Sequence, residues 1–115
     1  MKRRVLVMNG SRIVQSDSGE GWISDKVEKA GNLKAGIYNL YMAKPADKNH
    51  ATVGVFVHSD KNSVYQQCGK QIIVHSRNDF DIVPGIGSTK SIEYNAEGRA
   101  VASDSSIKQV RSRSR

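Results

Sequence analysis

A thiol and an imidazole seven residues apart are the groups of this 115-residue chain best suited to covalent chemistry. Cys68 falls in a predicted hairpin connection, and His75 lies further along the strand that follows, with Asp79 as a third polar group. A base beside a thiol favours the thiolate that a cysteine nucleophile requires. No pattern around Cys68 indicates an oxyanion hole or a helix N-terminus. We therefore predict no catalytic residues, with a Cys-His hydrolase or toxin-like enzyme as the alternative.

The three histidines do not form a metal-binding pattern. His50 falls in a loop, while His58 and His75 fall on different strands, without the spacing of a shared ligand set. Gly85 and Gly87 lack the third glycine and the helix of a dinucleotide-binding fingerprint. We predict neither a metal nor another cofactor.

Four polar residues fall on neighbouring predicted strands, namely Gln66, Gln67, His75 and Arg77. Adjacent strands bring such side chains into cross-strand contact. Two interpretations remain open. If the cluster is buried, its members must find hydrogen-bond partners and form a network that fixes the strand register. If it is exposed, it is a recognition patch for a protein partner.

The net charge of +7 is concentrated at the two ends of the chain. Between residues 5 and 106 the basic and acidic residues balance, which argues against a broad basic docking face and against acidic DNA mimicry. Two short cationic arms would bind nucleic acid through phosphates without reading bases, or else serve only solubility. The residues expected to contact phosphates are Lys2, Arg3, Arg4, Lys108, Arg111, Arg113 and Arg115.

A predicted three-strand meander in residues 53–83 positions most of these candidates. Its β-rich runs are residues 53–58, 63–67 and 71–77, separated by turn-forming residues. Strand side chains alternate between faces. We therefore expect the valines of the first run on one face, and Phe56 and His58 together on the other.

The remaining sequence predicts short strands and one helix. Asn9-Gly10 between two apolar runs predicts a hairpin. Residues 24–30 predict two turns of helix, with Ser24 or Asp25 as the N-cap and Gly31 as the stop. Further extended segments are expected at residues 36–42, 80–83, 91–94 and 99–102, with a surface loop at 43–52.

These elements predict an all-β, mainly antiparallel fold. We expect a small barrel or roll of SH3-like size with one short helix. Residues 1–104 would form one β-rich domain, and residues 105–115 a disordered basic tail.

The cysteine content and the lengths of the apolar runs indicate the cellular compartment in which we expect the protein. One cysteine excludes an internal disulfide framework, which fits a reducing compartment. The apolar run at residues 5–8 is shorter than a signal peptide requires, and no stretch approaches the roughly 20 apolar residues of a membrane span. We expect a cytoplasmic protein without membrane contact.

Residues 36–101 resemble the KfrB-type domain of plasmid-encoded proteins. The matching motifs are Gly36-Ile37-Tyr38, Val64-Tyr65-Gln66-Gln67, Ile73-Val74-His75-Ser76-Arg77, Asp81-Ile82-Val83-Pro84 with Gly87, Ser91-Ile92-Glu93-Tyr94 and Gly98-Arg99-Ala100. The resemblance implies a non-enzymatic adaptor of a conjugative, broad-host-range plasmid in the bacterial cytoplasm, active in plasmid maintenance or transfer. Its partner would be a plasmid- or host-encoded protein, and a homo-oligomer is compatible with the sequence. A regulator that blocks a host defence or exclusion protein is a further alternative.

Overall fold

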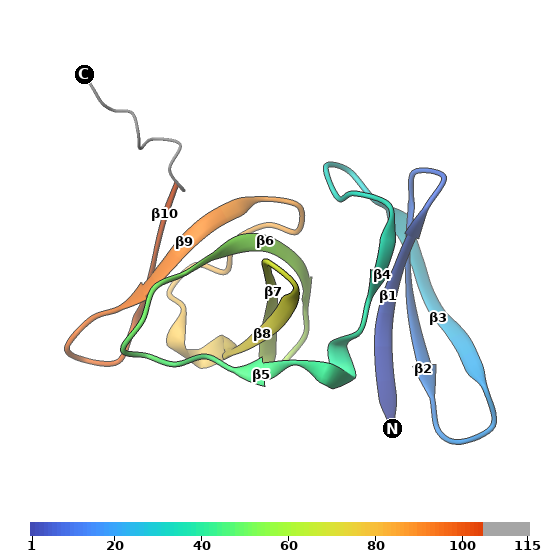
Figure 1. The fold of residues 1–115 in the computed structure, drawn as a ribbon, viewed down its shortest axis with the longest axis horizontal. Helices are drawn as coiled ribbons and strands as arrows, with labels where there is room; N and C mark the ends of the chain where they lie inside the picture. The colour runs from blue at the N-terminus through green and yellow to red at the C-terminus, as the bar shows by residue number, and fades with distance from the viewer. Residues whose placement is uncertain (105–115) are drawn as a thin grey trace.

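The structure, a computed structural model, describes residues 1–104, which fold into two β-sheets lying side by side (Figure 1). The N-terminal sheet has the strand order β3-β2-β1-β4, and the C-terminal sheet has the order β10-β9-β6-β7-β8-β5. All strand pairings are antiparallel except that of β5 with β8. The predicted all-β, mainly antiparallel class is therefore confirmed.

The bounds of the elements follow the chain in order. The N-terminal sheet consists of β1 (Lys2–Met8), β2 (Ser11–Asp17), β3 (Trp22–Lys29) and β4 (Gly36–Tyr38), and a 3-10 turn η1 (Leu40–Met42) follows it. The C-terminal sheet consists of β5 (Lys44–Pro45), β6 (Thr52–Ser59), β7 (Ser63–Cys68), β8 (Gln71–Ser76), β9 (Thr89–Tyr94) and β10 (Ala100–Asp104). A second 3-10 turn, η2 (Arg77–Asp79), follows β8.

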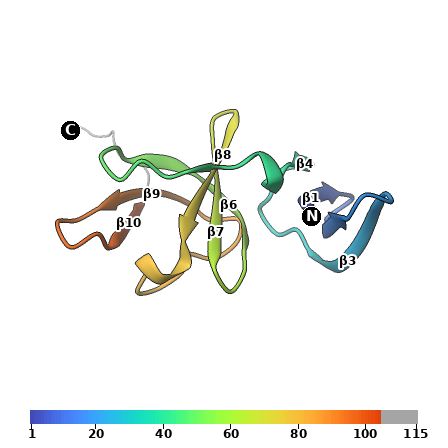
Figure 2. The ribbon, with the colours of Figure 1, turned by 90° about the horizontal axis from the view of Figure 1, so that it is seen from below.

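Neither sheet closes on itself, so the barrel form of the prediction is wrong. The N-terminal sheet ends at β3 and β4, and the C-terminal sheet ends at β10 and β5. Strand β5 contains only Lys44 and Pro45, and a proline has no N–H to donate to a further strand. The C-terminal sheet instead curls around its own apolar interior (Figure 2). The predicted tail, residues 105–115, lies outside the described residues.

Residues 24–30 do not form the predicted helix. Residues 24–29 belong to β3, an edge strand whose Val27 pairs with Ile13 of β2, and Ala30 follows the strand. The register shifts between Val14 and Gln15, which leaves Asp25 without a partner residue. Such a bulge conceals the alternation that identifies a strand, and pairing with a neighbour overrides weak helix propensity.

The predicted meander is present as β6, β7 and β8, but one side-chain direction differs from the prediction. The β6–β7 register shifts between Phe56 and His58, so Val57 forms a bulge. One extra residue reverses the alternation beyond it. His58 therefore lies on the face opposite Phe56, not on the same face.

Three other segments show how far the predicted boundaries hold. The β1–β2 hairpin turns at Asn9 and Gly10, both with positive φ, as the sequence indicates. The strand expected at residues 36–42 ends at Tyr38 and gives way to η1. The stretch at residues 80–83 forms no strand, although Phe80 makes an isolated bridge with Ala100.

Two apolar cores lie on either side of the C-terminal sheet. The inter-sheet core joins the two sheets and consists of Val5, Val7, Val14, Ala30, Leu33, Tyr38, Leu40 and Val57. The inner core lies within the curl of the C-terminal sheet and consists of Phe56, Val64, Phe80 and Ile92. Strand β6 supplies one buried residue to each core, because the neighbouring side chains of Phe56 and Val57 point to opposite faces of the sheet.

Candidate functional site

A buried polar network connects strands β6 to β9. The side chain of Gln66 is fully buried, and its Nε2 donates to the carbonyl oxygens of Gly54 at 3.2 Å and Lys90 at 3.0 Å. Its Oε1 accepts from Thr52 Oγ1 and from His75 Nε2, each at 2.9 Å. One amide thus links four strands and satisfies polar groups that would otherwise be buried without partners.

The hydrogen bonds also fix the protonation of His75. Gln66 Oε1 can only accept, so His75 Nε2 carries the proton and His75 Nδ1 accepts from the Tyr94 hydroxyl at 2.7 Å. Burial lowers the pKa of His75 to about 4, and burial raises the pKa of Tyr94 to about 12. Both side chains are therefore neutral at pH 7.

The four predicted partner-binding residues separate into two groups. Gln66 and His75 belong to the buried network, so their predicted direct contact with a partner does not fit their burial. Gln67 is half-buried at the surface, and its Nε2 donates to the carbonyl oxygen of Gly69. Arg77 is exposed, and its Nη1 donates to the Asp60 carbonyl at 2.7 Å. Partner binding stays a prediction for Gln67 and Arg77.

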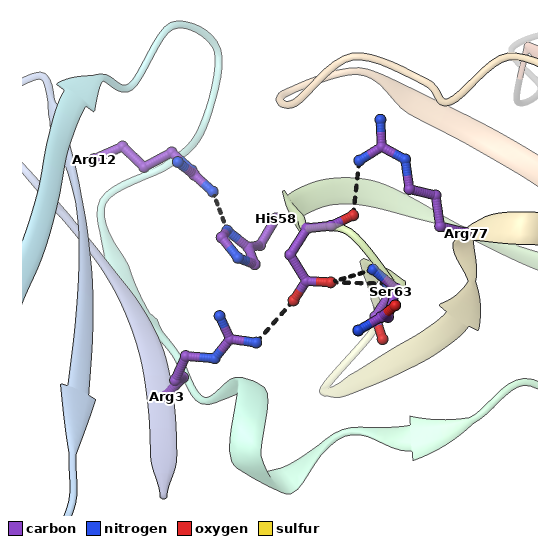
Figure 3. A network of polar contacts seen from close by, with 7 residues as sticks. Arg3, Arg12, His58, Ser63 and Arg77 are labelled. Atoms are coloured by element: carbon purple, nitrogen blue, oxygen red, sulfur yellow. Dashed lines mark hydrogen bonds and ion pairs between the residues drawn. The ribbon is translucent and has the colours of Figure 1, made fainter.

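A second polar cluster joins the two sheets across the inter-sheet core (Figure 3). Arg12 of β2 is only 4% exposed, and its Nε donates to the Val57 carbonyl at 3.0 Å. Its Nη2 donates to His58 Nδ1 at 2.7 Å, and its Nη1 pairs with Glu28 at 2.8 Å. Burial lowers the pKa of Arg12, although Glu28 opposes this effect. The contacts with β6 fix how the two sheets pack.

The turn between β6 and β7 forms the other polar contact between the sheets. Asp60 Oδ2 accepts from Arg3 Nη2 at 2.7 Å, and Asp60 Oδ1 accepts from the N–H groups of Asn62 at 2.9 Å and Ser63 at 2.8 Å. Desolvation raises the pKa of Asp60, but the hydrogen bonds outweigh it and hold the pKa below its usual range. The turn is therefore rigidly attached to β1 and, through Arg77, to the end of β8 (Figure 3).

His58 is buried in an unfavourable setting for a positive charge. A guanidinium only donates, so His58 Nδ1 accepts from Arg12 and the proton lies on Nε2. That Nε2 is buried without a hydrogen-bond partner among the described residues. Burial and the charge of Arg12 lower the pKa of His58 to about 4.

We expect the protein to lose stability as the pH falls from about 6.5 to about 4. An unfolded histidine titrates near pH 6.5, whereas His58 and His75 titrate near pH 4 in the fold, so the unfolded state binds more protons in this window. The stabilisation is complete above this window and is lost as the pH falls through it. Urea unfolding should show a free energy lower by about 2 kcal/mol or more at pH 5 than at pH 7.

The exposed His50 supplies the control for this pH dependence. The variant His50→Asn should lose the same free energy between pH 7 and pH 5, because His50 lies at the surface. An unfolding free energy that stays constant over this range would contradict the burial of the other two histidines.

The first three cations do not form the predicted loose arm. They belong to β1, where Arg3 is paired with Asp60. Lys2 Nζ lies 5.2 Å from the centroid of the Tyr41 ring, and the Arg4 guanidinium lies 4.0 Å from that of Trp22. These contacts compete with any phosphate. The other predicted phosphate ligands, Lys108, Arg111, Arg113 and Arg115, lie outside the described residues.

The thiol of Cys68 and the imidazole of His75 do not meet. His75 pairs with Val64, and Cys68 lies four residues further along β7, which is about 13 Å at the rise of a strand. Both ring nitrogens of His75 are already hydrogen-bonded, and burial raises the pKa of Cys68 to about 11. The Cys-His alternative lacks the geometry that it requires.

A groove runs between β4 and the C-terminal sheet, and we call it the seam groove. A hollow of about 810 Å³ is lined on one side by Lys34, Ile37 and Tyr38 and on the other by Val55, Gln67 and Thr89. A second hollow of about 290 Å³ shares Ile37, Tyr38 and Gln67 with the first and continues toward Lys70. A cavity of this size falls within the range of ligand-binding pockets.

Sequence reasoning missed both Arg12 and the seam groove. A signal for Arg12 was present, because it alternates with Val14 on the face that continues the apolar residues of β1. A cation on an apolar face needs a partner from another element. The groove has no such signal, since it depends on how the two sheets pack.

Comparison with known proteins identifies the family of this chain. Residues 51–104 match the KfrB domain. The match spans β6 to β10, so it begins later than the residue 36 expected from sequence motifs. Protein TraB of Escherichia coli is 36% identical over 102 residues, which are 85% of this chain and 70% of TraB. Within residues 1–104 no helix has the length and apolarity to cross a bilayer.

These findings define a small all-β, plasmid-associated protein built from two open sheets. The chain belongs to the KfrB family.

Proposed function

We propose that this protein is a non-enzymatic adaptor that acts in plasmid maintenance or conjugative transfer in the bacterial cytoplasm. It does so by binding a plasmid- or host-encoded protein. Membership of the KfrB family and the similarity to TraB support the plasmid context. The observation that carries the binding role is the seam groove, an open hollow of about 810 Å³ with polar and apolar walls. Two polar contacts between the sheets, at Arg3 and Arg12, hold its walls in a fixed relation.

Deletion of the coding sequence from its plasmid tests this role. We expect lower plasmid retention during growth without selection, or a lower frequency of transfer to recipient cells, and recovery when the gene is supplied in trans. The matched control is the same gene carrying Lys61→Glu, a change at an exposed turn residue, which should restore the wild-type phenotype. Retention and transfer that are both unchanged by the deletion would refute the proposal.

Non-specific DNA affinity is a second part of the proposal. Four cations without an acidic neighbour lie in residues 105–115. We expect replacement of Lys108, Arg111, Arg113 and Arg115 by glutamine to weaken retention on duplex DNA. The slope of log affinity against log salt should fall by at most about 3.6 in magnitude, because each phosphate contact contributes about 0.9. Equal retention of both proteins at low salt would remove this part of the proposal.

A further inference from the structure

The seam groove follows the free edge of a strand. Ile37 and Tyr38 are neighbours in β4, so their side chains project to opposite faces of the sheet, yet both line the groove. A hollow that contacts both must lie at the edge of the strand. One edge of β4 pairs with β1, and the other pairs with no strand among the described residues. The groove therefore borders backbone groups that are available for a further strand.

The opposite wall is a row of side chains that crosses four strands. The registers align Ile72 of β8, Gln67 of β7, Val55 of β6 and Thr89 of β9 side by side. All four residues line one or both of the hollows that form the groove. An extended segment paired with β4 would direct alternate side chains onto this row, which offers aliphatic, amide and hydroxyl groups.

The charge of the groove determines which kind of extended segment it favours. Its lining includes Lys34, Lys44 and Lys70, all exposed, and no aspartate or glutamate. Lysines at the rim of an interface attract acidic partners and repel basic ones. The cationic rim also disfavours a second copy of this chain in the groove, because the chain itself carries a net charge of +7.

We propose that the seam groove binds an extended acidic segment of a partner protein, which adds to the free edge of β4 and places alternate side chains on the row of Ile72, Gln67, Val55 and Thr89. This inference rests on the adaptor function proposed above and names the chemistry of the partner. Main-chain hydrogen bonds supply affinity in this mode of recognition, while the row and the lysines supply selectivity.

The first test measures binding of a defined probe to the full chain. The probe is an eight-residue peptide that alternates valine and aspartate, labelled with fluorescein and followed by fluorescence anisotropy. We expect saturable binding of this peptide and none of a matched peptide with lysine in place of aspartate. Of two forms N-methylated at alternate residues, one should lose binding, because only one set of N–H groups faces β4. Binding by both methylated forms, or by the lysine peptide, would overturn the proposal.

The second test uses charge variants of the groove. The double variant Lys34→Glu/Lys70→Glu should weaken binding of the aspartate peptide at least about tenfold, since each reversal replaces an attraction with a repulsion. Thr89→Glu, an exposed change on the row, should also weaken it. Lys61→Glu makes one such charge reversal in the turn at the other end of β7 and should bind as the wild type does. Equal binding by all four proteins would refute the site.

The two proposals fail in different ways. If deletion of the gene lowers retention or transfer but the double variant restores both fully, the adaptor function stands and the groove is not its binding site. If the deletion has no effect on either, the function itself fails, whatever the peptide does. Thermal unfolding of each variant shows whether a loss of binding reflects loss of the fold.

Discussion

Gly54→Ala should prevent the protein from folding. Gly54 lies in β6 between β7 and β9, and a Cβ added there would lie 1.8 Å from the carbonyl oxygen of Gln67 and 3.1 Å from the Cα of Cys68. Both contacts are with backbone atoms, so no side-chain rotation relieves them. The β6–β7 pairing must separate, and we expect a loss of at least about 4 kcal/mol, comparable with the whole stability of many small domains.

The measurement for Gly54→Ala is urea unfolding followed by far-ultraviolet circular dichroism. Gly85→Ala is the control, because an added Cβ there meets no atom within 4 Å and the backbone is not left-handed. The control should unfold at the wild-type denaturant concentration. A Gly54→Ala protein within about 1 kcal/mol of the wild type would show that β6 and β7 do not approach as described.

Gln66→Leu should destabilise the protein by about 2–4 kcal/mol, whereas Gln67→Leu should change the stability by less than about 0.5 kcal/mol. The two residues are the same type and neighbours in β7. Gln66 satisfies the buried N–H of His75 and the hydroxyl of the half-buried Thr52. Leucine has a similar size but no polar atoms, so these donors would lose their acceptor.

Comparing the two glutamine variants shows whether stability is lost because the buried hydrogen-bond network is broken or because any substitution in β7 is destabilising. Gln67 is half-buried, and its side chain donates to the Gly69 carbonyl within the turn. Unfolding in urea at pH 7 measures both variants. An equal loss for the two variants would mean that the strand, rather than the buried amide, determines the stability.

The sequence was sufficient for the features that depend on neighbouring residues. The Asn9-Gly10 turn and the meander of β6, β7 and β8 follow from local turn chemistry and the alternation of side chains. The resemblance to the KfrB family also came from short motifs and is confirmed by the match over residues 51–104. Such signals lie within a few residues of one another, so a single chain displays them.

The predicted helix and the predicted direction of His58 were wrong because a bulge interrupts the alternation of side chains in each of these strands. Asp25 in β3 and Val57 in β6 are bulges, and each shifts the register by one residue. The first shift concealed a strand, and the second placed His58 on the face opposite the one predicted. A bulge depends on the partner strand, whose register the sequence of one strand does not contain.

The candidate site was predictable only in part, because its components depend on packing between the sheets. The sequence indicated that Gln66 and His75 lie close together, but both side chains are buried and therefore do not fit direct contact with a partner protein. Arg12 and the seam groove required both sheets to be placed. Contacts between residues far apart in the sequence determine which polar residues remain at the surface.

The apolar outer face of the C-terminal sheet has a consequence for any larger protein that carries this domain. The family match covers β6 to β10 of the C-terminal sheet, and the side chains of Val55, Val57, Tyr65 and Ile72 on its outer face pack against the N-terminal sheet. A fragment cut at residue 51 would therefore expose an apolar surface to water and tend to aggregate. In a protein where a different segment precedes this domain, that segment must supply apolar side chains that pack against these four residues.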